Sequence, residues 1–327
     1  MAGEVSSSLQ VLAFSEPVSV SDMASGWDNG FRPGRYAYAD ARYELATRYQ
    51  AVTVGYLRRE LFDFTFSRGT SEYYYQLEAG TDNDEPYQLQ LDADAFSARG
   101  FYLAYEIPVA DWSISPKISV FRMDHYQFGS LSGQAQGDEA TVALSYYFDQ
   151  DKILDFPTDG SLGEGFSADV EPGTGYSVDL SVGGQYLSYN VSAEVRDLWS
   201  YLSFPVAART TGCVNIAADE NVSCPSSGGR SEEIDFSVSI KPTVSFLVQR
   251  QDKGLRVEGF LHDRIRRAAI GYGADTPYGN MWGAAYTTRQ LGVGWQGRFG
   301  QISLATDDYR LSKARDVELN ASLVLNW

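Results

Sequence analysis

The sequence predicts an all-β protein in which about sixteen antiparallel strands, with fourteen or eighteen as the alternatives, close into one barrel. Three observations predict this fold. Apolar and polar residues alternate with a period of two in many segments, one segment (234–248) alternates without a break, and short connections alternate with longer ones. A period of two places the two sets of side chains on opposite faces of a strand. No linker or compositional break divides the 327 residues, so a single domain, 1–327, is expected.

The last eleven residues show the pattern clearly. Their odd positions are all apolar: Val317, Leu319, Ala321, Leu323, Leu325 and Trp327. A terminal strand with outward apolar residues and a final aromatic residue resembles the closing strand of Gram-negative outer-membrane β-barrels, where that ending is the insertion signal. The resemblance implies that Leu323, Leu325 and Trp327 form this signal. It also implies a location in the bacterial outer membrane, contact with its lipids and lipopolysaccharide, and insertion by the barrel-assembly machinery.

Strands in the first half of the chain are expected where alternation is bounded by Gly, Asp, Ser or Pro. They are 8–14, 35–49, 51–66, 72–79, 87–96, 101–107, 112–126, 140–148 and 166–170. In 72–79 the apolar face carries Tyr73, Tyr75 and Leu77. A Gly/Ser/Gln loop is expected up to Gly137. Residues 155–160 are predicted to form a turn, and they are also similar to a strand-connecting motif of outer-membrane barrel-assembly proteins.

Strands in the second half are expected at 176–182, 185–202, 234–248, 255–270, 282–297, 301–311 and 317–327. The segment 234–248 is longer than the usual strand of about five or six residues, and a strand that spans a bilayer needs such a length. Its Pro242 indicates a local bulge. The longest loop is expected at about 203–231. Short turns are predicted at the periplasmic end and longer loops outside the cell.

Inward faces of the predicted strands are polar and charged. This pattern resembles that of porins, in which a ladder of arginines faces acidic residues across the lumen and sets a transverse electric field that orients solutes. The candidate residues for lumen and selectivity are Arg256, Glu258, His262, Arg264 and Arg266 on 255–270, with Asp40, Arg42, Glu44, Arg48, Lys117 and Lys241 elsewhere on the wall. The alternative is that these charges pair with Asp40, Glu44 or Asp63 and only line the wall. At about sixteen strands, wall side chains are not expected to fill the interior, which leaves a water channel or an inserted loop.

Two cysteines, Cys213 and Cys224, lie in a polar stretch and are expected to form a disulfide in an oxidising compartment. A metal site is not expected, because two thiolates without a nearby His are too few ligands. The net charge of −17 argues against nucleic acid, because a phosphate backbone would be repelled, so no nucleic-acid partner is expected. Met1-Ala-Gly-Glu-Val shows no signal-peptide pattern, so an exported chain is expected here in its mature form with an added Met.

The function predicted is an outer-membrane, porin-like channel for passive diffusion of small polar solutes or ions. The alternatives are an export or assembly barrel for a polysaccharide or protein partner, and a surface lipid-modifying enzyme. For the enzyme, His125 with Asp124, Ser130 and Ser132 is the candidate group, but the spacing fails to match that of outer-membrane phospholipases. No nucleotide-binding or hydrolase motif is present, so neither enzymatic activity nor a cofactor is expected. A homo-oligomer is left open.

Overall fold

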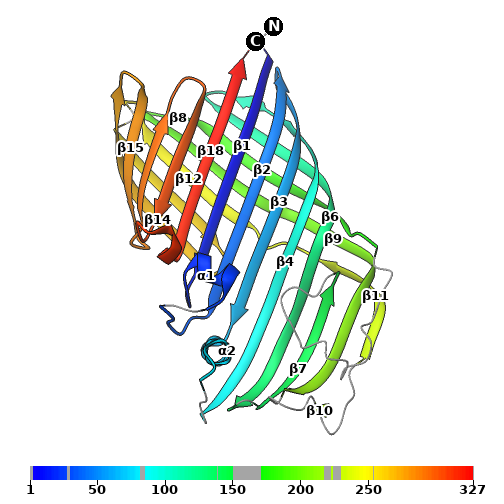
Figure 1. The fold of residues 1–327 in the computed structure, drawn as a ribbon. Helices are drawn as coiled ribbons and strands as arrows, with labels where there is room; N and C mark the ends of the chain where they lie inside the picture. Colours follow the sequence, from blue (N-terminus) through cyan, green and yellow to red (C-terminus); the bar gives the residue numbers. More distant parts are fainter. Residues whose placement is uncertain are drawn as a thin grey trace.

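The computed structural model describes residues 3–27, 30–81, 85–137, 139–149, 171–216, 222–223, 230–252 and 254–326. Its dominant feature is a closed ring of fourteen antiparallel strands (Figure 1). The ring runs through β1 (Gly3–Ser15), β2 (Tyr36–Tyr49), β3 (Val52–Phe66), β4 (Pro86–Tyr105), β6 (Trp112–Gln136), β8 (Thr174–Tyr186), β9 (Tyr189–Ile216), β12 (Thr243–Arg250), β13 (Leu255–His262), β14 (Ile265–Thr276), β15 (Gly279–Tyr286), β16 (Leu291–Gln296), β17 (Gly300–Thr306) and β18 (Asp316–Asn326).

The first and last strands close the ring. β1 pairs with β18 from Glu4 opposite Asn326 to Phe14 opposite Asp316, and with β2 on its other side. Closure leaves the ring without a free edge, which is what a sheet needs to satisfy its backbone groups in lipid. The predicted closed antiparallel barrel is confirmed, with the lower of the two alternative strand numbers.

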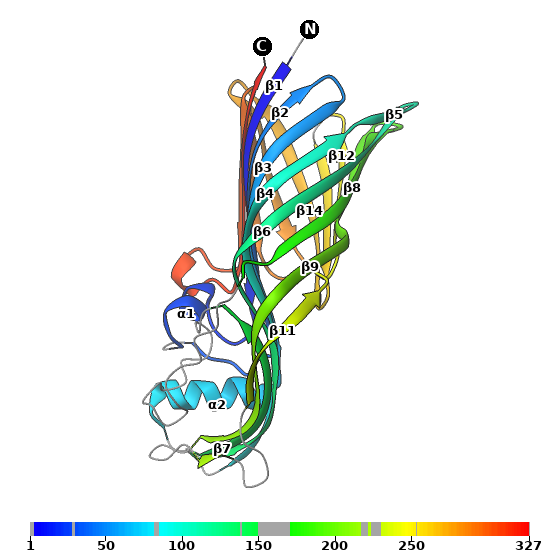
Figure 2. The same cartoon turned by 90° about the vertical axis from the view of Figure 1, so that its right-hand side faces the viewer.

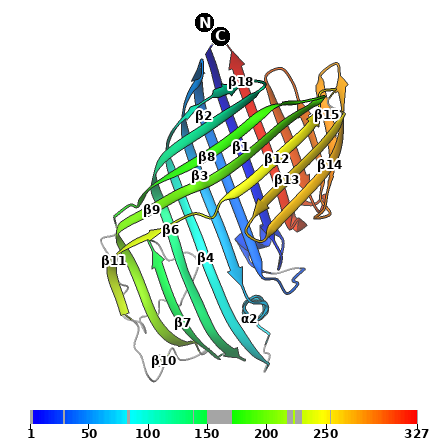
Figure 3. The same ribbon diagram turned by 180° about the vertical axis from the view of Figure 1, so that it is seen from behind.

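Three long strands of the ring continue past it into a projecting part of the same sheet, the extension (Figure 2). Beyond the ring, β4 pairs with β6, β6 with β7 (Glu139–Phe148), β7 with β9, and β9 with β11 (Arg230–Val238). The short β10 (Val222–Ser223) also pairs with β9, and β5 (Ile107–Val109) prolongs β4 at the opposite end. Figure 3 shows that the extension lies below the ring, on the side of β6 and β9.

The two ends of the ring differ. The end that holds both chain termini has two-residue turns such as Gln50-Ala51 and Leu187-Ser188, whereas the other end carries the long connections and the extension. It also carries the helices α1 (Val20–Ser25) and α2 (Arg68–Ala79) and the 3-10 turn η1 (Leu311–Lys313). Among the described residues, no helix has the length and apolar character to cross a membrane.

Several sequence-based boundaries were wrong. The predicted strand 72–79 belongs to the helix α2, which begins at the N-cap Ser67 and ends at Gly80 in the left-handed conformation. The predicted strand 255–270 is two strands, because Asp263 and Arg264 form a turn. The segment 234–248 is interrupted at 239–242, around Pro242. Strand replaces the expected loop at 127–136 and part of the expected loop at 203–216, and 155–160 and 166–170 lie outside the described residues.

The outer face of the ring is apolar. Exposed apolar side chains cover it, among them Leu45, Val54, Leu103, Ile118, Val120, Ile270, Leu291, Val293, Leu323 and Leu325. Exposed aromatic side chains lie near the turns of the terminal end: Tyr49, Tyr105, Tyr186, Tyr272, Tyr278, Trp295 and Phe299. An apolar band with aromatic residues at its border is the exterior expected of a barrel in an outer membrane.

Candidate channel lumen

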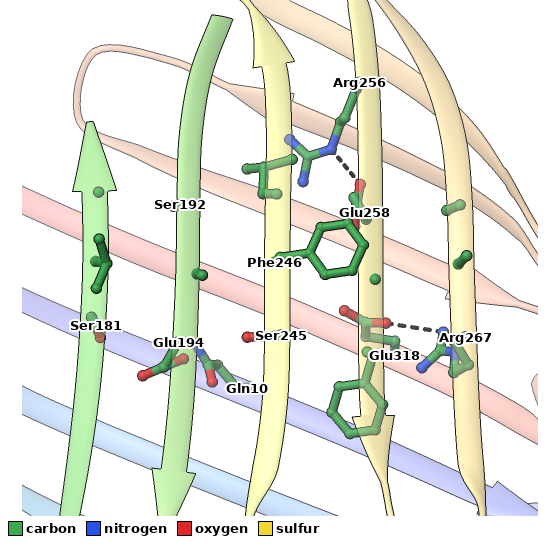
Figure 4. A pocket seen from close by; sticks show the side chains of 18 of the residues that line it. Gln10, Ser181, Ser192, Glu194, Ser245, Phe246, Arg256, Glu258, Arg267 and Glu318 are labelled. Atoms are coloured by element: carbon green, nitrogen blue, oxygen red, sulfur yellow. Dashed lines mark hydrogen bonds and ion pairs between the residues drawn. The ribbon is translucent and has the colours of Figure 1, made fainter. Parts of the chain in front are cut away.

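The inward face of the ring surrounds a cavity of about 520 Å³ (Figure 4). β6, β8, β9, β12, β13 and β14 form one wall, and Gln10 of β1 and Glu318 of β18 reach it from the opposite wall. Serines dominate one part of the lining: Ser113, Ser115, Ser181, Ser192 and Ser245. Hydroxyl groups both donate and accept hydrogen bonds, so this surface suits water and small polar solutes. We call this space the lumen cavity.

Five charged side chains border the lumen cavity: Glu194 and two ion pairs. Arg256 forms an ion pair with Glu258, two residues along the same strand, and its guanidinium lies 4.1 Å from the Trp282 ring centroid. Arg267 of β14 lies 3.0 Å from Glu318 of β18. The cavity therefore has charge of both signs on a serine-rich wall.

A network of buried ion pairs crosses the lumen beside this cavity. The crossing network consists of Asp40, Arg42 and Glu44 of β2, Arg59 of β3, Lys117 of β6, Asp179 of β8, and Arg196 and Asp197 of β9. It holds four acidic and four basic groups, so its formal charge is balanced.

Asp197 is the centre of the crossing network, and its side chain has no exposed surface. Arg59 Nη1 donates to one carboxylate oxygen of Asp197 at 2.8 Å, and Arg42 Nη2 donates to the other at 3.0 Å. Arg59 Nε also lies 3.1 Å from Asp40. In the wall, β4, β6 and β8 separate β3 from β9, so these contacts join strands that are not neighbours in the ring. Buried charges need such multiple partners to offset their desolvation.

A bulge in β9 places Asp197 in this position. Asp197 has a φ of 54°, and the register between β8 and β9 shifts between Val178 and Leu180. The carboxylate of Asp179 accepts the Asp197 backbone N–H at 2.8 Å, and the Ser177 hydroxyl donates to the Asp197 carboxylate at 2.8 Å. Bulges redirect a side chain from the regular alternation, which is the effect seen here.

A second set of contacts closes the lumen nearer the extension. His262 of β13 lies 3.5 Å from Asp63 of β3, and its Nδ1 is 3.0 Å from the Thr243 hydroxyl. Lys241 Nζ lies 2.9 Å from the same Asp63. Buried aromatic and aliphatic side chains pack around this group, including Leu12, Tyr36, Tyr38, Leu61, Phe96, Phe121, Phe128 and Phe204. Side chains of the wall thus fill this part of the interior, contrary to the expectation from strand number, because opposite walls approach closely enough to touch.

The predicted lumen residues divide into three groups. Asp40, Arg42, Glu44 and Lys117 belong to the crossing network, His262 and Lys241 to the second closure, and Arg256 and Glu258 to the lumen cavity. Arg48 pairs with Glu106 near the terminal end. The prediction that Arg264 and Arg266 face the lumen is wrong. Arg264 lies in the β13–β14 turn, and Arg266 is exposed on the outer face opposite Leu261.

Sequence reasoning missed Arg59, Asp179, Arg196, Asp197 and Arg267. Arg59 lies in the run Arg58-Arg59-Glu60, where charged residues interrupt the apolar–polar alternation, although β3 pairs there without a register shift. Arg267 was missed because the two-residue turn changes which residues face inward. Even-numbered residues face the lumen on β13, whereas odd-numbered residues face it on β14. No local pattern marks the bulge at Asp197.

The predicted disulfide and insertion signal remain predictions, and among the described residues His125 lacks the serine partner that an enzyme would need. Cys224, Trp327 and the side chain of Cys213 lie outside the described residues, so the disulfide and the complete insertion signal stay predictions. His125 Nδ1 lies 2.8 Å from Asp149, and no described serine is in hydrogen-bond contact with it. No group of three or more metal-ligating side chains is found in the described part of the chain.

Comparison with known proteins gives distant structural likeness only. No protein-family model and no curated protein matches the chain. The toluene transporter TodX of P. putida aligns over 99% of this chain and 88% of its own length, with 8% identity and a TM-score of 0.39. The toluene transporter TbuX of Ralstonia pickettii covers the same shares with 10% identity and a TM-score of 0.30. Salmonella typhi OmpF in complex with daunomycin covers 100% and 97%, with 7% identity and a TM-score of 0.19. The structure itself shows a closed antiparallel strand ring with an apolar exterior, which is the architecture of a transmembrane β-barrel.

Proposed function

We propose that this protein is an outer-membrane channel for small polar solutes or ions, and that it conducts when the crossing network rearranges. The observation that carries the proposal is the lumen cavity, a serine-lined space of about 520 Å³ inside a closed membrane barrel. The cavity is bounded by side chains from opposite walls rather than by a separate domain. Side-chain ion pairs rearrange without breaking the backbone ring, so they suit a gate.

The charges of the lumen cavity set the expected selectivity. Arg256 and Glu258 lie next to each other on the wall and are partly exposed to the cavity. Fixed charges in a narrow, low-dielectric passage favour ions of the opposite sign. Because the two charges cancel in the native pair, we expect weak selectivity for the native protein and opposite selectivity when either is neutralised.

Single-channel recording in planar bilayers under a salt gradient tests this function. We expect stepwise openings, a reversal potential that moves toward cation selectivity in Arg256→Gln, and one that moves toward anion selectivity in Glu258→Gln. Arg250→Gln is the matched control, because Arg250 is paired with Asp252 at the exposed β12–β13 turn. Stable insertion without openings in the native protein and in every variant would contradict the proposal and favour an export or assembly barrel. We propose no enzymatic activity.

A further inference from the structure

Three arginines stand side by side on the outer face of the ring. Arg58 of β3 is directly opposite Arg99 of β4, and Arg99 is directly opposite Arg122 of β6. All three side chains are exposed. We call them the arginine row. Its position on the lipid side is unusual, since cationic residues on that face destabilise a barrel by about 2–4 kcal/mol at the bilayer midplane and by little near the interfaces.

The arginine row holds more positive charge than the described residues around it neutralise. Arg58 lies 3.2 Å from Glu60, and Arg99 lies 3.1 Å from Asp124. No described acidic side chain lies within ion-pair distance of Arg122. Like charges directly opposite each other in a sheet repel, so three adjacent guanidinium groups with two carboxylates leave an uncompensated charge. An external anion would remove this repulsion, on a protein whose net charge is −17.

An apolar groove begins at the next row of residues. Tyr56, Phe101, Val120, Tyr176 and Tyr201 follow each other in register across β3, β4, β6, β8 and β9. Together with Arg99 and Arg122 they line a surface groove of about 840 Å³. A ligand that fits both features has an anionic head for the arginines and an apolar chain for the groove.

The arginine row lies on the side of the ring that faces the outer leaflet. Arg122 is the last β6 residue that pairs with β8, opposite Thr174, and beyond it β6 leaves the ring and joins β7 in the extension. The extension is at the end opposite the two termini and the short turns. In outer-membrane barrels the short turns are periplasmic, so the arginine row belongs to the outer half, where lipopolysaccharide is the lipid.

We propose that the arginine row binds the phosphate groups of lipopolysaccharide, with an acyl chain in the adjacent apolar groove. Guanidinium groups bind phosphate through paired, charge-assisted hydrogen bonds, which gives the site both strength and orientation. The proposal does not depend on conduction through the lumen, since every residue of the site is on the exterior.

Native mass spectrometry of the detergent-purified protein with diphosphoryl lipid A tests the proposal. We expect the native protein to bind this lipid, and the double variant Arg99→Gln/Arg122→Gln to bind it at least about tenfold more weakly, as expected for lost hydrogen bonds between charged groups. Arg122→Lys retains the charge but loses the paired donors, so its affinity should lie between those of the native protein and the double variant. Arg266→Gln is the matched control, because it removes an exposed outward arginine elsewhere on the barrel.

Two lipid comparisons decide the outcome. Lipid A without its phosphates should bind the native protein as weakly as diphosphoryl lipid A binds the double variant. Equal affinity for the two forms of lipid A, or for native protein and double variant, would overturn the proposal. Phosphatidylglycerol should bind more weakly than diphosphoryl lipid A; equal binding would overturn the assignment to lipopolysaccharide. Heat-modifiable migration on a gel confirms that each variant is folded before it is compared.

Discussion

Arg59 and Asp197 lie 2.8 Å apart, although three strands separate them along the barrel wall. The contact therefore passes through the interior and not along the sheet. Both side chains are almost completely buried, with 4% and 0% of their surface exposed. This ion pair limits the width of the lumen between β3 and β9, because the two strands cannot move apart without breaking it.

Asp197→Asn is expected to weaken the barrel and to increase channel opening. The substitution leaves the guanidinium groups of Arg42 and Arg59 buried without their shared carboxylate, a change that costs about 3–5 kcal/mol in other proteins. Urea unfolding of the refolded protein measures the loss, and bilayer recording measures the open fraction. Asp252→Asn, which breaks an exposed turn ion pair, should change neither. Native-like stability together with native-like conductance would show that the network is not a gate.

Ser181→Trp is expected to reduce the conductance of open channels, since the indole would occupy part of the lumen cavity. The expected effect is steric, because the substitution leaves the charges of the lumen cavity unchanged. Ser181→Ala is the control, because it removes the hydroxyl and keeps the space. Recording single-channel current at one voltage compares the three proteins. If tryptophan leaves the current unaltered, the ion path does not pass this wall.

Ser67→Ala is expected to loosen α2. The Ser67 hydroxyl accepts the Thr70 backbone N–H at 3.0 Å, and loss of such an N-cap typically costs about 1 kcal/mol. Hydrogen exchange followed by mass spectrometry should show faster exchange in 68–79, with the strands unaffected. Glu78→Ala, an exposed change near the other end of the helix, should exchange as the native protein does. Unchanged exchange in Ser67→Ala would mean that packing against β4 alone holds the helix.

The predicted disulfide between Cys213 and Cys224 is expected in protein extracted from outer membranes. Peptide mass mapping without reductant should recover the two cysteines in one linked species, and that species should be absent from Cys213→Ser. Reduction before digestion provides the control. Alkylation of both thiols without prior reduction would exclude the bond.

Deletion of Trp327 is expected to lower the amount of protein inserted in the outer membrane, because the terminal aromatic residue completes the predicted insertion signal. Trp327→Phe retains an aromatic ending and should insert normally. The measurement is the heat-modifiable fraction in isolated outer membranes. Equal insertion of the deletion variant would show that Leu323 and Leu325 are sufficient.

The sequence was a good guide where a strand with lipid on one side alternates regularly and contains no hidden turn. In β2 and β18 the alternation alone identified the inward and outward faces, because acyl chains require an unbroken apolar row. The same alternation gave a wrong prediction for α2, where Tyr73, Tyr75 and Leu77 alternate as in a strand. The helix is stabilised instead by its Ser67 cap and by packing against β4.

The lumen was harder to predict than the wall. Its inward charges were recognised on β2, where the alternation is regular, but the contact of Arg59 with Asp197 depends on how closely opposite walls approach and on a bulge without a sequence signal. Likewise, Arg267 faces inward only because Asp263 and Arg264 make a two-residue turn. Curvature and register are properties of the whole ring, so single segments do not contain them.

Pairing of β1 with β18 also constrains how the protein is made. Residues 4 and 326 are partners, so the contact with the greatest separation in sequence is needed to complete the sheet. Folding rates fall as contacts become less local, and the ring offers no shorter route to closure. Until the final strand has been synthesised, the edges of β1 and of each newly formed hairpin have no partner and are prone to aggregate. Hairpins along the chain can pair earlier, but the ring itself closes only once β18 is available to β1.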